Sequence, residues 1–415
     1  MWKSLSFKIH VQGYRISTSG DAHGGAKFLM VRVATRLDLR GVDRKIDDRK
    51  ITAIHFSVKH LSVTLLVALV LFATGCRTMY PDSATGTYPR GLRSTEELAS
   101  LKRAYWAGFS TPAATEARTG LYAVTPYYPG KIPVVLVHGL LSEPRTWDEM
   151  LNKIRNDPRI DANFQFWVFM YPTGNSYVQS AADLREDLNE TLIQLDPYRN
   201  DAALSHMVLV GHSMGGLLSK LQVTYSDQTL WQTISDRPID DFEVDMDTRT
   251  QMERALFFEP QPFIERVVYI GTPHAGSTVS QSTIGWLGNK LVRFPRGLQE
   301  NYQHIVQNNL SLLRTDSAAS IPTSIDRLAP GDSILLATQQ LQVNAQVKQH
   351  SIIGNGHPLP DETDGDGVVS FASAKLAGVE SEYVIQAEHS DLHKDEGSIY
   401  EVERILMEHL AAVRR

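Results

Sequence analysis

The pentapeptide Gly211-His212-Ser213-Met214-Gly215 places a serine between two glycines, where an apolar run meets a helix-like run. The apolar run MVLV precedes it, and LLSKLQVTY, which predicts a helix, follows it. G-x-S-x-G between a strand and a helix makes a tight turn that exposes the serine hydroxyl, while the glycines let the strand and the helix approach closely. Because a serine hydroxyl alone is a poor nucleophile, the pattern predicts a base and an oxyanion hole nearby.

The base is expected near the C-terminus, because proteins with this turn carry the serine, the acid and the histidine in that order. His389 and His393 lie in AEHSDLHKDEG, between the last strand-like run and the last helix-like run. His389 comes directly after the strand-like run and is the predicted base, with His393 as the alternative. His274, in GTPHAGS, precedes the acidic candidates and therefore has the wrong order.

An acidic turn, TDGDGVVS at 363–370, supplies the candidate acids Asp364 and Asp366. It lies between the two last strand-like runs, which is where the order of the triad requires an acid. The run DETDGDG also looks like a calcium loop, but it lacks the further ligands and the final glutamate of an EF-hand. We therefore predict no metal site in this turn.

Alternating strand-like and helix-like runs must position these side chains. Continuous apolar runs predict strands that are buried on both faces, and the helices between them imply parallel connections in an α/β fold. The predicted strands are 132–139, 164–172, 206–212, 266–273, 349–355 and 381–388, and the predicted helices are 178–195 and 397–413. Ser94 and Glu97 form a capping-box pattern at the start of a further predicted helix, 94–110.

Two stretches interrupt this alternation of strands and helices. Residues 226–262 are polar and acidic, and residues 277–345 mix glycine, serine and asparagine with scattered apolar residues. Both follow strand-like runs, at the sheet edge where loops surround active sites, so they are expected to form a lid or cap. The alternative is that they are ordinary surface helices. We assign 121–415 to one domain with these insertions, and 77–120 to a tether and an N-terminal helix.

The front of the chain contains a short apolar run, LSVTLLVALVLFA at 61–73, which ends close to Cys76. The run is too short to cross a bilayer comfortably and fits the core of a signal peptide. Residues 58–76 resemble a bacterial lipoprotein signal, in which small residues precede a cysteine that becomes lipidated. The resemblance implies a lipid anchor at Cys76 in the cell envelope, and Arg77 favours the outer membrane. The alternative is a buried helix with an ordinary cysteine.

The extension 1–57 precedes this signal, although signals normally begin a chain. We therefore expect the translation start downstream, at Met30 or near Val58. The bulk composition adds little to this picture. Lysine and arginine number 41 and aspartate and glutamate 47, so the formal net charge is −6, and no clustered basic excess points to a nucleic acid. A single cysteine excludes an internal disulfide.

The segments as a set resemble a bacterial lipase/esterase of the α/β-hydrolase superfamily, near the inositol-deacylase branch. They occur in the order VLVHGLLSEPRTW, FMYPTGN, VLVGHSMGGLLSK, VVYIGTPHAGS, DGDGVVS and EHSDLHKDEGSIYEVERIL. The resemblance implies an α/β-hydrolase fold with a mostly parallel sheet, and a Ser213–Asp366–His389 triad. It also implies that the backbone N–H groups of Leu140 and Met214 form the oxyanion hole, with His138 structural.

The expected activity is therefore cofactor-free hydrolysis of carboxylic esters through an acyl-enzyme, with an acyl ester, possibly a lipid, as substrate. The same triad would also serve an acyltransferase, a thioesterase or an amidase, because all of them transfer acyl groups. A non-catalytic surface lipoprotein built on a hydrolase scaffold is the remaining alternative. The complete set of roles in the expected order favours an enzyme.

Overall fold

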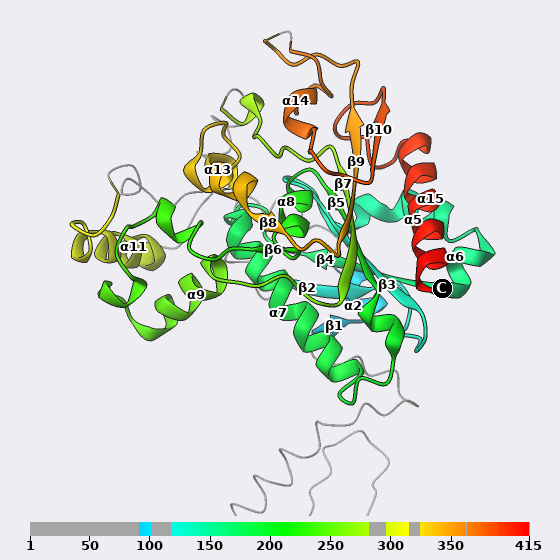
Figure 1. The fold of residues 1–415 in the computed structure, drawn as a ribbon, viewed down its shortest axis with the longest axis horizontal. Coiled ribbons are helices and arrows are strands. Elements are labelled where there is room, and N and C mark those ends of the chain that lie inside the picture. The colour runs from blue at the N-terminus through cyan, green and yellow to red at the C-terminus, as the bar shows by residue number, and fades with distance from the viewer. Residues whose placement is uncertain (1–90, 101–117, 282–295, 315–323, 362, 415) are drawn as a thin grey trace, which may run out of the picture. The chain divides into compact units, whose positions relative to one another are not determined.

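An eight-stranded sheet lies at the centre of the computed structural model, which describes residues 91–100, 118–281, 296–314, 324–361 and 363–414 (Figure 1). The strand order is β1-β2-β4-β3-β5-β7-β9-β10. β2 runs antiparallel to β4, and the other neighbouring pairs are parallel. The strands are β1 (Leu92–Arg93), β2 (Gly120–Ala123), β3 (Ile132–Val137), β4 (Phe164–Met170), β5 (Met207–His212), β7 (Ile264–Ile270), β9 (Lys348–Gly354) and β10 (Ser381–Ile385).

Helices cover both faces of this sheet, and Figure 1 shows α5, α6 and α15 together on one side of it. The helices are α2 (Thr95–Ser100), α5 (Asp148–Ile154), α6 (Pro158–Asn163), α7 (Tyr177–Leu195), α8 (Met214–Lys220), α9 (Met246–Leu256), α11 (Arg296–Asn308), α12 (Ser324–Arg327), α13 (Ser333–Gln340), α14 (Phe371–Ala374) and α15 (Glu396–Val413). The predicted α/β-hydrolase fold with a mostly parallel sheet is confirmed.

The central strands are apolar throughout because each of their two faces packs against helices. In β3, Val135 and Val137 belong to the core that includes α7 and α8. Val134 and Leu136 point the other way, into the core that includes α5, α6 and α15. Side chains alternate between the faces of a strand, so burial on both faces requires an unbroken apolar run. Each such buried side chain contributes about 1.5–3 kcal/mol to folding.

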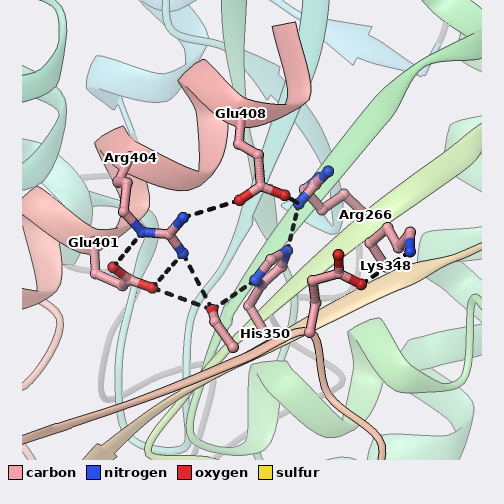
Figure 2. Close-up of polar contacts among 8 residues, drawn as sticks. Arg266, Lys348, His350, Glu401, Arg404 and Glu408 are labelled. Atoms are coloured by element: carbon pink, nitrogen blue, oxygen red, sulfur yellow. Dashed lines mark hydrogen bonds and ion pairs between the residues drawn. The ribbon is translucent and has the colours of Figure 1, made fainter. Parts of the chain in front are cut away.

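A polar network attaches the last helix to the sheet (Figure 2). On the sheet, Arg266 of β7 donates to Nε2 of His350 on β9, and it also pairs with Glu408 of α15 at 3.0 Å. On α15, Arg404 donates to Glu401 at 2.7 Å and to Glu408 at 2.9 Å. Because α15 follows directly after the segment that carries the predicted base, this network also fixes where that segment ends.

The N-terminal capping box is confirmed. Ser94 N donates to the carboxylate of Glu97 at 2.9 Å, and Glu97 N donates to Ser94 Oγ at 3.2 Å. The helix α2 that follows is described as far as Ser100, and the rest of the predicted helix lies outside the described residues. The predictions for residues 1–57, the signal at 58–76, the tether up to residue 90 and Cys76 itself also lie outside them.

The prediction that LLSKLQVTY forms one helix is wrong. Helix α8 ends at Lys220, and a short strand, β6 (Thr224–Tyr225), pairs antiparallel with β8 (Gln342–Val343). The side chain of Gln222 donates to the carbonyl oxygens of Leu218 and Ala181 at 2.9 Å, where the chain turns away from the helix. β-branched and aromatic residues then favour the strand over the helix.

The two inserted stretches contact each other. Residues 226–262 contain α9 and short 3₁₀ turns, and the described part of 277–345 contains α11, α12, α13 and β8. Asn309 binds the backbone of Glu243 twice, at 2.7 and 3.1 Å, and Ser235 donates to the Leu312 carbonyl at 2.6 Å. The first stretch lines an open pocket of about 800 Å³ that includes Trp231 and Phe257 but none of the predicted triad. A lid over the active site stays a prediction.

Candidate active site

Ser213 sits between β5 and α8 in a strained backbone conformation. Its φ of 54° lies in the left-handed region that residues with a side chain rarely adopt, and its N–H donates to the Ile270 carbonyl at 2.8 Å. A Cβ on Gly215 would lie 2.1 Å from the Val137 carbonyl oxygen, and one on Gly211 would lie 2.5 Å from the Gly215 carbonyl oxygen. The strand and the helix therefore approach as closely as the glycine pattern predicted.

His389 reaches Ser213 from the loop between β10 and α15. Its Nε2 lies 2.9 Å from Ser213 Oγ, and its Nδ1 lies 2.7 Å from Asp366 Oδ2. A carboxylate oxygen only accepts, so Nδ1 carries the hydrogen and Nε2 presents its lone pair to the serine hydroxyl. This is the tautomer that a general base for the serine requires.

Asp366 is held by the turn that contains it. Its Oδ1 accepts from the backbone N–H groups of Val368 at 3.0 Å and Val369 at 2.7 Å, which leaves Oδ2 for His389. Its own carbonyl oxygen accepts from the His389 N–H at 2.9 Å. The neighbouring candidate, Asp364, is exposed, and its carbonyl oxygen accepts from Phe371 N at 2.8 Å. The structure thus brings Asp366, and not Asp364, to the histidine.

The two alternative histidines occupy other places. His393 is buried, and its Nε2 lies 2.5 Å from Thr146 Oγ1. Burial, with Lys394 nearby, lowers the pKa of His393 to about 3. His274 packs edge-on against Tyr269 with ring centroids 4.9 Å apart, and burial lowers its pKa well below the usual range. Neither ring takes the place that His389 occupies beside Ser213.

The segment after β3 lies directly against Ser213. A Cβ on Gly139 would come within 2.8 Å of the Ser213 Cβ, so the backbone that continues into Leu140 passes beside the serine. Met214, the first residue of α8, follows the serine in the chain. His138 is stacked on Tyr171 with ring centroids 4.4 Å apart, and burial lowers the pKa of His138 to about 4. A buried, neutral ring suits the structural role predicted for His138.

The sequence assigned no role to His212, although its ring contacts the predicted base. His212 Nε2 lies 3.0 Å from the backbone carbonyl oxygen of His389. Its place directly before the serine was the one available signal, because that position must lie close to the site. The spacing of the motif says nothing about what its side chain binds.

Among the described residues, no group of three or more histidine, cysteine, aspartate or glutamate side chains is arranged to hold a metal ion. None of the helices in the described ranges combines the length and the apolar character needed to cross a bilayer.

The mostly parallel sheet and the turn that carries Ser213 are those of the α/β-hydrolase fold. Residues 131–293 match the family described as "Putative serine esterase (DUF676)". This match includes the serine turn and supports serine hydrolase activity.

Solved structures with a similar fold include lipases and esterases. The mature form of the Bacillus licheniformis lipase BlEst2 is 16% identical, with a TM-score of 0.41, over 69% of this chain and 97% of that one. A lipase-esterase related protein from Clostridium acetobutylicum is 10% identical, with a TM-score of 0.38, over 69% and 98%. The esterase EaEST from Exiguobacterium antarcticum is 13% identical, with a TM-score of 0.36, over 71% and 96%. A comparison with curated proteins gave no match.

Proposed function

We propose that the protein is a carboxylic ester hydrolase that works through an acyl-enzyme on Ser213. The observation that carries the proposal is the continuous relay of 2.9 Å from Ser213 Oγ to His389 Nε2 and 2.7 Å from His389 Nδ1 to Asp366 Oδ2. At this distance Ser213 Oγ can pass its proton to His389 Nε2 without rearrangement, while Asp366 orients the imidazole.

In the proposed reaction, His389 takes the serine proton while Ser213 Oγ attacks the ester carbonyl carbon. The negative charge on the carbonyl oxygen is stabilised by the backbone N–H groups of Met214 and Leu140, and the loss of one such donor typically costs about 3–4 kcal/mol. His389 then gives its proton to the leaving alkoxide. A water molecule, deprotonated by His389, cleaves the acyl-enzyme and restores the serine. Asp366 keeps the imidazole in the required tautomer throughout, and no cofactor takes part.

A fluorophosphonate probe and a series of p-nitrophenyl esters of increasing acyl length test this proposal on the full chain. Wild type should become labelled and hydrolyse at least one ester. Ser213→Ala should not be labelled, and its turnover should fall on the order of 10⁶-fold, because the nucleophile is lost. Labelling of Ser213→Ala, or a folded wild type that is neither labelled nor active, would contradict the proposal.

We further propose that Cys76 is lipidated and anchors the protein to the bacterial cell envelope, in the outer membrane. The support is the apolar run at 61–73, the small residues before the cysteine and the Arg77 that follows it. Cys76→Ser should then release the protein from the membrane fraction and abolish incorporation of labelled palmitate. Unchanged membrane fractionation of the variant would argue against the anchor.

A further inference from the structure

The ring of His212 contacts the backbone of His389, the base in the proposed function. We propose that His212 is a positioning residue. Its Nε2–H donates to the backbone carbonyl oxygen of His389 and so holds the backbone from which the catalytic imidazole extends. The contact measures 3.0 Å and joins residues 177 positions apart in the chain. This inference rests on the proposed function, because it concerns the same imidazole.

With His212, both ends of the His389 backbone are held. The His389 N–H donates to the Asp366 carbonyl at 2.9 Å, and the His389 carbonyl accepts from His212 at 3.0 Å. The imidazole is bound at its two nitrogens by Asp366 and Ser213. Four hydrogen bonds therefore set the position and the direction of this side chain, and the bond from His212 is one of the two that hold its backbone.

The His212 ring itself has little freedom to move. It is 5% exposed and contacts the rings of both His389 and His393, at centroid distances of 4.9 and 4.3 Å. The backbone of Gly139 closes the Nδ1 side, because a Cβ there would lie 3.2 Å from His212 Nδ1. A donor that is held this rigidly can place a loop backbone, whereas an exposed one could not.

The contact also decides which ring nitrogen of His212 carries the hydrogen. A carbonyl oxygen only accepts, so Nε2 carries the hydrogen, and Nδ1 has no hydrogen-bond partner among the residues that the structure describes. Burial, with His393 and His389 close by, lowers the pKa of His212 well below the usual range. The ring is therefore neutral and adds no second positive charge beside the imidazolium that forms on His389 during turnover.

Two variants of similar length separate the hydrogen bond from the packing. His212→Gln keeps an amide N–H at about the reach of Nε2, and His212→Met has the same chain length without a donor. We expect His212→Met to lower kcat for a p-nitrophenyl ester on the order of 100-fold with KM little changed, because a misplaced imidazole costs transition-state stabilisation. The kcat of His212→Gln should stay within about tenfold of the wild-type value, because its amide N–H replaces the donor.

Hydrogen exchange gives a readout that does not depend on turnover. The amide of His389 should exchange faster in His212→Met than in wild type, and at nearly the wild-type rate in His212→Gln. If His212→Met does not fold, His212→Phe keeps an aromatic ring at this position, lacks the donor and carries the same expectation.

Equal kcat in the folded donor-free variant and wild type would overturn the assignment. So would equal losses in the glutamine and donor-free variants. Failure of the proposed function gives a different result, in which wild type itself is neither labelled by the fluorophosphonate nor active on the esters.

Discussion

Replacing Asp366 by asparagine should preserve the fold and reverse the hydrogen bond that orients His389. The backbone N–H groups of Val368 and Val369 donate to Oδ1 at 3.0 and 2.7 Å, so an asparagine must keep its carbonyl oxygen there. Its NH₂ group then faces His389 Nδ1, where Oδ2 now accepts. Because the amide donates, Nδ1 must become the acceptor, and the hydrogen moves to Nε2, which points at Ser213.

In that tautomer the imidazole cannot accept the serine proton. The equivalent change in a Ser-His-Asp site lowers kcat by about 10⁴-fold, which is about 5 kcal/mol of transition-state stabilisation. The assay is the initial rate of p-nitrophenyl ester hydrolysis, together with the rate of fluorophosphonate labelling. Both should fall together, while KM and the thermal midpoint stay near those of wild type.

Asp364→Asn is the matched control, because this exposed carboxylate lies two residues away in the same turn. It should keep kcat within about twofold of wild type, as surface changes away from the site usually do. If Asp364→Asn lost activity and Asp366→Asn kept it, the acid would have to be reassigned. Full activity in both variants would mean that the tautomer of His389 does not depend on Asp366.

Three further variants test the packing and the buried charges. Gly215→Ala should cost about 3 kcal/mol of stability or more in urea denaturation, because its Cβ would lie 2.1 Å from the Val137 carbonyl oxygen. Burial, with other carboxylates nearby, raises the pKa of Asp187 to about 7, so the folded protein loses stability as the pH rises from about 4 to 7. Asp187→Asn should therefore stabilise the protein more at pH 8 than at pH 5. Burial beside Arg266 lowers the pKa of His350 to about 4, so the folded protein loses stability as the pH falls below about 6.5. His350→Gln should reduce this loss of stability, as measured by urea denaturation.

Each of these expectations has a result that would contradict it. Gly130→Ala is the control for crowding, because no atom lies within 4 Å of its Cβ and only its positive φ is strained. A Gly215→Ala protein as stable as this control would argue against the close approach of α8 and β3. An equal gain from Asp187→Asn at both pH values would show that its carboxylate is not disfavoured by folding. If stability fell with decreasing pH as steeply in His350→Gln as in wild type, His350 would have the same pKa in the folded and the unfolded protein.

The long central strands could be predicted because burial on both faces leaves a continuous apolar run, as in 132–139 and 206–212. The short strands could not. β2 has four residues and β6 two, and such segments become strands through their pairing with β4 and β8 rather than through their own sequence. The same pairing ends the helix that LLSKLQVTY alone predicted.

The serine turn is a local feature, so its geometry followed from five neighbouring residues. The histidine was harder, because His389 and His393 lie four positions apart in one loop. What separates them is long-range: the backbone of His389 bonds to Asp366 and His212, while the ring of His393 turns to Thr146. No spacing rule contains those contacts, and for the same reason the partner of the His212 ring could not be predicted.

Strand β10 is the last strand of the sheet, bonded to β9, and the loop that follows it carries His389. Ser213 follows β5, two strands further in from β9. Strands at a sheet margin exchange between open and closed forms at a lower free energy than the centre. Low urea concentrations should therefore abolish esterase activity while most of the circular dichroism signal is still native. On dilution, activity should return at the rate at which β10 pairs again with β9.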